Sequence, residues 1–354
     1  MFTKKFIFFI GFVILLIFPG CIINIKGSGN KGAQAGIFKS FDKGNSWIQK
    51  SLVPTTSGKP LSLAGVNIRD LSLDPQDSLA LYIATPNNGL WYSYDGAENW
   101  FPAGSLKTTS VNAVAVDPTL KCTIYVASGR EIWKSIDCNR SWEVVYTDAR
   151  GDIEIKNLAI EKDHRSIYAG TSAGDLLLSL DEGTSWQTFH RFSRSIQQVI
   201  IDPRAPEKIY VVLDRGIFKT IDRGKNWIDL TKSFDPFDRA KSTRSLFLDL
   251  TANDVLYAIM KFGIVKSTNA GETWEALPLL TPPGGVVIRG FAINPKDGKE
   301  IYYSVENAVY RTFDGGKNWE VNRLSNNAII TRLQVDFNNP SVLYASLYVV
   351  TQKR

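Results

Sequence analysis

The stretch Thr312-Phe-Asp-Gly-Gly-Lys-Asn-Trp319 decides the fold, because its pattern Ser/Thr-x-Asp-x-Gly-x-x-Trp recurs seven times along the chain. Seven of the nine tryptophans hold its last position, namely Trp47, Trp100, Trp142, Trp186, Trp227, Trp274 and Trp319. Its third position is occupied by Asp42, Asp95, Asp137, Asp181, Asp222, Asn269 and Asp314. Two copies depart at the glycine, which is replaced by Asn139 in one and moved forward to Gly96 in another.

This pattern predicts a tight turn between two antiparallel strands. The Asp carboxylate can accept hydrogen bonds from backbone N–H groups two residues on, and the glycine permits the positive φ that such a turn needs. The tryptophan then starts the next strand and can cover the turn with its ring. Strand residues such as Gly36-Ile-Phe-Lys39 and Gly216-Ile-Phe-Lys219 precede the turns, so one strand enters and another leaves.

A second unit lies between the turns, and it consists of an apolar strand, a short polar turn and a strand centred on a tyrosine. The apolar strand ends in an acid or its amide, at Asp74, Asp117, Glu161, Asp202, Asp249, Asn294 and Asp336. Each period of about 45 residues thus holds four short strands, termed A (apolar), B (tyrosine-centred), C (before the turn) and D (after the tryptophan). Four antiparallel strands per period predict an all-β fold, a seven-bladed β-propeller over residues 35–350.

The phase of the repeat predicts how the ring closes. The chain starts with a C–D pair, from Gly36 to about Leu52, and ends with an A–B pair, from Ile330 to Val350. We expect these halves to share one blade and to protect strand edges that would otherwise be exposed.

The eight-residue pattern resembles the Asp-box, or BNR repeat, of sialidases, sortilins and related propellers, over nearly the whole chain after about residue 35. The single ring is most similar to the photosystem II stability/assembly factor family, through its recurrent Gly-(Ile/Leu)-Phe/Trp-Lys strands before each turn. That resemblance implies a non-catalytic scaffold that holds a membrane-protein partner through one propeller face. The alternative is a carbohydrate-binding or glycoside-hydrolase-like propeller related to sialidases or xyloglucanases.

The N-terminus reads as a targeting segment. Lys4 and Lys5 precede a 13-residue apolar run, Phe6 to Phe18, and Pro19-Gly20-Cys21 follows. This resembles a bacterial lipoprotein signal over residues 1–21, which implies lipidation of Cys21 and a flexible tether over 22–34. An uncleaved anchor or an ordinary signal is the alternative. In each case we expect export, and with lipid or an uncleaved anchor the chain would be held at a membrane.

Charge and composition exclude some partners. The formal net charge is +6 with the basic and acidic residues interspersed, which does not favour nucleic acid.

Aligning the A strands on their final acid predicts a polar ring at the mouth of the central channel. Five positions before that residue stand Arg69, Asn112, Lys156, Gln197, Arg244, Arg289 and Thr331, with Arg332 beside the last. We expect this ring on the face that carries the long D–A loops. It could bind an acidic peptide, a carboxylate or an anionic sugar, since arginine suits planar anions. Alternatively it is a solvated rim, with its charges paired to Asp70, Glu154 and their neighbours.

No catalytic residue, metal site or cofactor is predicted. The chain has two histidines, His164 and His190, which we expect to be isolated, exposed turn or loop residues. A glycosidase needs two carboxyl groups roughly 5–10 Å apart. The turn acids, at one per blade, cannot converge on one substrate, and Asp70 and Glu154 are merely near the mouth.

The cysteines other than Cys21 predict a disulfide. Cys122 is expected to open a B strand, and Cys138 follows the C strand of the same blade. A hairpin folded about Ser128-Gly129-Arg130 places the two opposite each other, at a spacing that a disulfide can bridge in an oxidising compartment. Two buried thiols are the alternative.

Overall fold

A computed structural model describes residues 35–349, apart from 108, 164, 238–242 and 326. The predicted signal, lipidation site Cys21 and tether lie outside the described residues. The described part belongs to one compact unit, Ala33–Arg354. Within it, no helix has the length and apolar character needed to cross a membrane.

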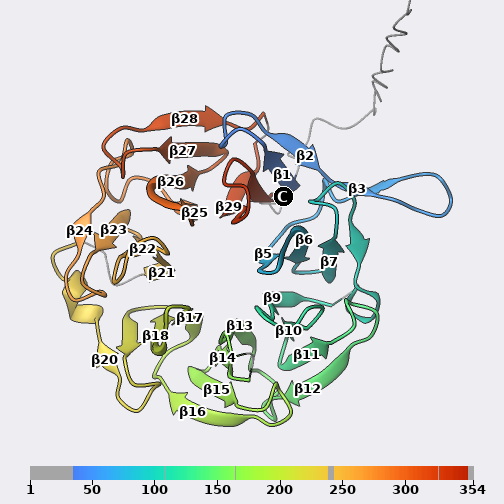
Figure 1. Cartoon of the computed structure of the whole chain (residues 1–354), viewed down its shortest axis with the longest axis horizontal. Coiled ribbons are helices and arrows are strands. Elements are labelled where there is room, and N and C mark those ends of the chain that lie inside the picture. Colours follow the sequence, from blue (N-terminus) through green and yellow to red (C-terminus); the bar gives the residue numbers. More distant parts are fainter. Residues whose placement is uncertain (1–34, 108, 164, 238–242, 326, 350–354) are drawn as a thin grey trace, which may run out of the picture. The chain divides into compact units, whose positions relative to one another are not determined.

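Seven four-stranded antiparallel sheets surround a central channel, so the fold is a seven-bladed β-propeller (Figure 1). The innermost A strands are β5 (Asp70–Asp74), β9 (Val111–Val116), β13 (Ile155–Ile160), β17 (Ile196–Asp202), β21 (Thr243–Leu248), β25 (Ile288–Asn294) and β29 (Ile329–Val335). The B strands are β6 (Asp77–Ala84), β10 (Ile124–Ser128), β14 (Ile167–Thr171), β18 (Ala205–Leu213), β22 (Leu256–Met260), β26 (Asp297–Val305) and β30 (Leu343–Tyr348).

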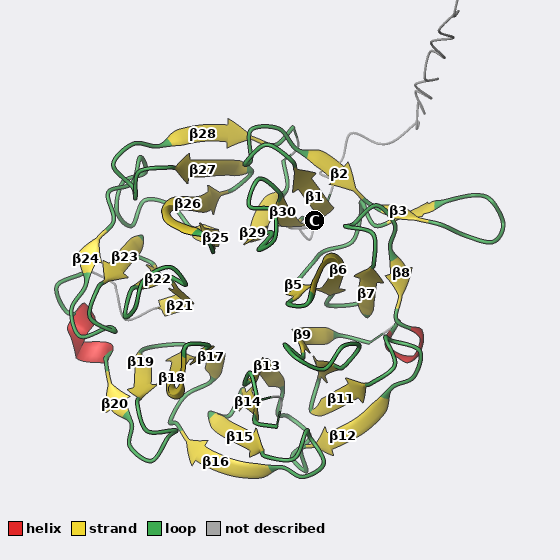
Figure 2. Cartoon of the chain, in the orientation of Figure 1, coloured by secondary structure: helices red, strands yellow, loops and turns green. Residues whose placement is uncertain are grey.

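The outer half of each blade holds the C and D strands. The C strands are β1 (Gly36–Ser40), β7 (Leu90–Ser93), β11 (Glu131–Ser135), β15 (Asp175–Ser179), β19 (Ile217–Thr220), β23 (Ile264–Ser267) and β27 (Ala308–Thr312). The D strands are β2 (Ile48–Lys50), β8 (Phe101–Pro102), β12 (Glu143–Thr147), β16 (Gln187–Arg191), β20 (Ile228–Asp229), β24 (Glu275–Ala276) and β28 (Glu320–Arg323). The described helices are two short 3-10 turns, η1 (Gly104–Leu106) and η2 (Thr231–Phe234), drawn in red in Figure 2.

The predicted closure is confirmed. One sheet has the order β2-β1-β30-β29, so the N-terminal C–D pair and the C-terminal A–B pair form a single blade. The pairing of β1 with β30 is antiparallel and runs from Gly36 opposite Leu347 to Ser40 opposite Leu343. We number the blades from β5–β8 as blade 1 to this shared sheet as blade 7.

The hydrophobic core is divided into seven clusters, each lying between two neighbouring blades. The central tyrosine of each B strand is buried, at positions Tyr82, Tyr125, Tyr168, Tyr210, Tyr257, Tyr302 and Tyr344. Tyr344 of blade 7, for example, packs with Leu71 and Leu81 of blade 1. Stability therefore depends on contact between blades as well as within them.

The turns between C and D strands carry the predicted hydrogen-bonding residues, but in a different pattern. Asp314 Oδ1 accepts the N–H groups of Lys317 (2.9 Å) and Asn318 (3.0 Å), three and four residues on rather than two. Thr312 Oγ1 donates to Asp314 Oδ1 (2.7 Å) and accepts the N–H of Gly316 (3.0 Å).

The reason for this difference is that two successive residues, not one, adopt positive φ. They are Gly315 (76°) and Gly316 (96°) here, and Arg223 (57°) and Gly224 (81°) in blade 4. Two left-handed residues in a row curl the chain back, so that later N–H groups point at the carboxylate. The ring of Trp319 covers the turn, and its Nε1 donates to the Gly316 carbonyl (3.2 Å).

One element was not predicted. The connection from blade 7 to blade 1 contains a small hairpin, β3 (Leu52–Val53) with β4 (Leu61–Ser62), whose loop projects from the disc (Figure 1).

Candidate functional site

The mouth ring is built on β-bulges. The pairing register between an A strand and its neighbouring B strand shifts at the ring position. The ring residue therefore has no residue opposite it in the B strand. This holds for Asn112, Lys156, Gln197, Arg244, Thr331 and, together with Gly290, Arg289. Arg69 lies just before β5, and its N–H bonds to the Ala84 carbonyl (2.8 Å). Bulges re-aim side chains, and here they direct polar residues to the start of the A strands.

Most of the ring surrounds one cavity of about 180 Å³ in the channel. The predicted residues that line it are Asn112, Lys156, Gln197, Arg244, Arg289 and Arg332. Arg69 and Thr331 lie beside it instead. The A strands start on the face that carries the D–A connections, as expected from the order of the strands.

Several of the ring's charged or polar groups are paired. Arg69 donates to Asn112 Oδ1 and, at 3.4 Å, to Ser110 Oγ, while Asn112 Nδ2 donates to the Ile155 carbonyl (2.9 Å). Lys156 Nζ lies 2.9 Å from Glu154 Oε2, and this contact holds the pKa of Glu154 below its usual range. Arg69 and Asn112 therefore link blades 1, 2 and 3, whereas Lys156 pairs with an acid of its own blade.

Arg332 and Asp70 join the last A strand to the first. Arg332 Nε lies 3.5 Å from Asp70 Oδ1, and Asp70 Oδ2 accepts the N–H of Val114 (3.5 Å). Burial raises the pKa of Asp70, and the Arg332 guanidinium partly opposes that shift.

Arg244 and Arg289 differ from the other cations of the ring. Across the part of the chain that the structure describes, neither forms an ion pair or a side-chain hydrogen bond, whereas each of the other ring cations bonds to a nearby side chain. Burial, and then the charge of Arg289, lower the pKa of Arg244. Two neighbouring cations that pair with no described acid form the part of the mouth best suited to attract an anion.

A second row of polar residues, one position after the ring, was missed from the sequence apart from Asp70 and Arg332. Asn157 Oδ1 accepts the N–H of Val199 (2.7 Å), and Gln198 bonds to both the N–H and the carbonyl of Leu246 (3.0 and 3.2 Å). Each thus ties its A strand to the next. Two adjacent polar residues between apolar ones, as in Ile155-Lys-Asn-Leu158, break the alternation of a strand and could have revealed the bulge.

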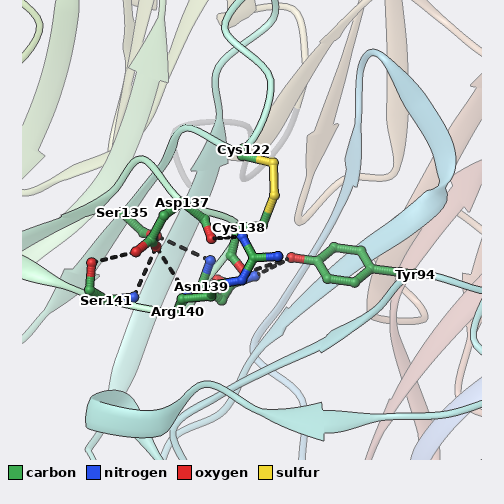
Figure 3. The surroundings of a disulfide bond; sticks show 8 residues. All are labelled: Tyr94, Cys122, Ser135, Asp137, Cys138, Asn139, Arg140 and Ser141. Carbon is green, nitrogen blue, oxygen red and sulfur yellow. Dashed lines mark hydrogen bonds between the residues drawn. A yellow bond between two sulfur atoms is a disulfide. The ribbon is translucent and has the colours of Figure 1, made fainter.

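Cys122 and Cys138 are joined by a disulfide, with their Cα atoms 4.2 Å apart (Figure 3). Cys122 lies two residues before β10 rather than at its start, because the strand pairing begins at Ile124. Cys138 is in the turn after β11, where its carbonyl accepts a hydrogen bond from Tyr94 of blade 1 (3.2 Å). The crosslink therefore holds a turn that also contacts the neighbouring blade.

One histidine lies in a different setting from the one predicted. His190 was expected in an exposed loop, but it lies on β16, half-buried between the rings of Phe192 and Trp227. This burial lowers its pKa. His164 lies outside the described residues, and no group of three or more His, Cys, Asp or Glu side chains among the described residues could hold a metal ion.

The solved structures similar to this chain include two kinds of protein. One is the GH74 enzymes: that of Niastella koreensis has a TM-score of 0.64 and 18% identity, covering 79% of this chain and 51% of the enzyme. The GH74 xyloglucanase of Xanthomonas campestris also has a TM-score of 0.64, with 17% identity over 80% of this chain and 51% of its own. This chain thus spans about half the length of these enzymes.

The other group matches over almost its whole length. YCF48 bound to a D1 peptide has a TM-score of 0.63 and 16% identity, covering 84% of this chain and 96% of YCF48. YCF48 from Cyanidioschyzon merolae has a TM-score of 0.62 and 16% identity, covering 83% and 97%. No family model matches the sequence, and no curated sequence matches it. At identities this low, the structural similarity shows a shared propeller fold and nothing more.

Proposed function

We propose that this protein is an exported, membrane-tethered binding scaffold that captures an acidic segment of a protein partner at the channel mouth. The observation that carries the proposal is the pair Arg244 and Arg289, which share one cavity and form no ion pair with another described residue. Arginine in such a setting binds carboxylates through paired, charge-assisted hydrogen bonds. The seven turns would be Asp-boxes that support the blades and take no part in binding.

Two further observations favour this function. YCF48, which resembles this chain over nearly its full length, has been solved with a bound peptide. In addition, both ends of the described chain lie at the mouth face: Gly36 N–H bonds to the Val66 carbonyl (3.1 Å), and Val349 N–H bonds to Asn67 (2.7 Å). A lipid-bearing tether over residues 22–34 would therefore join the propeller on the same face as the mouth.

The test is binding of a fluorescent decapeptide of alternating Glu and Gly, followed by fluorescence anisotropy. Arg244→Gln/Arg289→Gln should weaken binding by about tenfold or more, because a hydrogen bond to a charged group contributes roughly 1.5–3 kcal/mol. Lys225→Gln/Lys317→Gln is the matched control, since it removes two exposed cations from C–D turns on the opposite face. Equal affinity of the two double variants for the peptide would reject the mouth as the site.

A second candidate, a glycan-binding or hydrolysing propeller, is favoured by the likeness to GH74 enzymes. It predicts release of reducing ends from xyloglucan, or retention on a xyloglucan matrix. Substitution of Asp70 and Glu154 by the amides should abolish hydrolysis if those carboxyls are catalytic. If the wild-type protein neither hydrolyses xyloglucan nor is retained on the xyloglucan matrix, xyloglucan is excluded as its ligand.

A further inference from the structure

A cleft opens from the mouth between blades 5 and 6, and it is larger than the channel cavity. Its volume is about 400 Å³, within the range typical of sites for small ligands. Arg244 and Arg289 line both the cleft and the channel cavity, so the two spaces meet at this pair. The apolar side chains that line the cleft are those of Met260, Val286, Val287, Val305 and Ile329.

The charges around the cleft do not balance. Arg244, Arg289 and Lys261 line it against a single acid, Glu306. No carboxylate in the described part of the chain forms an ion pair with any of the three cations. Like charges so close together repel one another and raise the electrostatic free energy of the site. A bound anion would remove this repulsion.

We propose that this cleft binds a carboxylate attached to a short apolar group. The carboxylate would lie between the guanidinium groups of Arg244 and Arg289, and the apolar group against Val286, Val287 and Ile329. The proposal deepens the function proposed above and rests on it where the ligand is the end of a polypeptide, because a C-terminal leucine or valine has this chemistry. A free branched-chain acid has it too.

The lining favours this ligand over other anions. Two planar guanidinium groups match the two oxygens of a carboxylate. A sugar acid would place several hydroxyl groups against the five apolar side chains, where they would lose hydrogen bonds to water without replacement. An apolar group of four or five carbons instead buries surface there.

The experiment uses the whole protein and 4-methylpentanoate as the probe, with binding followed by saturation-transfer NMR and calorimetry. We expect 4-methylpentanoate to bind and 4-methylpentanamide, which lacks the charge, to bind at least tenfold more weakly. Val287→Glu should abolish probe binding, since Val287 is 44% exposed in the cleft and the new carboxylate would pair with the arginines. Val144→Glu is the control, at the same exposure on the outer strand β12 of blade 2.

Three outcomes separate this inference from the proposed function. Equal binding of the acid and the amide, or unchanged binding in Val287→Glu, overturns the cleft as a carboxylate site. If the acidic decapeptide binds while 4-methylpentanoate does not, the proposed function stands and the cleft inference fails. If the acid binds and is lost in Val287→Glu while no peptide binds, the cleft inference stands for a free acid. A peptide ending in Leu that binds more tightly than its C-terminal amide supports a polypeptide as the source.

Discussion

Asp222 and Asn269 hold the same position in neighbouring turns, but only one of them titrates. The Asp222 carboxylate accepts hydrogen bonds from the backbone N–H of Asn226 (2.9 Å) and from the side-chain Nδ2 of the same residue (2.7 Å). Asn269 accepts the N–H of Thr273 (2.9 Å) and donates to the Thr273 hydroxyl (2.8 Å). The backbone N–H of Asn226 and the hydroxyl of Thr220 lower the pKa of Asp222 to about 2. Asn269 shows that the turn can form without a charge.

Because the folded-state pKa of Asp222 is depressed, its contribution to stability is present above the unfolded pKa, near 3.9, and is lost as the pH falls towards 2. Asp222→Asn/Asn226→Thr copies the blade 5 turn into blade 4. We expect it to unfold at nearly the wild-type urea concentration at pH 7 and to lose less stability than wild type between pH 4 and 2. Urea unfolding at pH 7 and pH 3 checks this.

Asp222→Ala is the matched control, because it removes both acceptor oxygens and leaves the turn's N–H groups to water. It should lower the urea midpoint already at pH 7. If the Ala and the Asn/Thr variants unfold alike at pH 7, the side chain does not hold the turn.

At the residue scale, the sequence located the ring and named Asp70 and Glu154 as acids that could pair with it, and the structure pairs Lys156 with Glu154 and Arg332 with Asp70. Counting back from the A-strand acids selects six of the residues that the bulges expose, since the repeat aligns them. The contacts of Arg69 with Asn112, and the absence of an ion pair between Arg244 and any described acid, depend on side-chain directions across blades. A repeat pattern carries no information on those directions.

At the scale of the element, the disulfide fastens a single hairpin of blade 2. Cys122 and Cys138 are separated by 16 residues, and closing such a loop stabilises the fold by about 3 kcal/mol in the chain-entropy model. Cys122→Ser/Cys138→Ser should lose about this much free energy of unfolding, measured by urea denaturation. A reducing agent should lower the free energy of unfolding of the wild-type protein and leave that of the variant unchanged. Identical unfolding of wild type with and without reductant would contradict a stabilising crosslink.

The same hairpin shows what spacing predicts well and what it does not. The pairing of Val126 with Trp133 continues to Ile124 with Ser135, so a register counted from the turn brings the cysteines together. Strand ends were less predictable, since pairing stops at Ile124 and both cysteines adopt positive φ (69° and 58°) beyond it. The β3–β4 hairpin belongs to no repeat and therefore left no pattern to find.

At the scale of the whole molecule, the blade count and the closure followed from the phase of the repeat. The prediction of seven blades in a closed ring succeeds because every blade needs a neighbour on both sides to cover its apolar faces, which pack in the seven inter-blade cores. Function did not follow in the same way. The repeated residues support the ring, and the candidate site lies where the blades differ from one another, at Arg244 and Arg289.

Closure predicts that the ring fails as a unit when β30 is removed. Leu343, Tyr344 and Leu347 of this strand are almost fully buried, and each contributes roughly 1.5–3 kcal/mol. Their sum is comparable with the total stability of a typical domain, about 5–15 kcal/mol. A chain ending at Pro340 should therefore show no cooperative thermal transition.

A permuted chain that joins Val349 to Ala35 by a Gly-Ser linker and opens between Ser57 and Gly58 is the control. It keeps every blade strand, so it should melt near wild type. If the truncated chain melts like the permuted one, the shared blade does not hold the ring together.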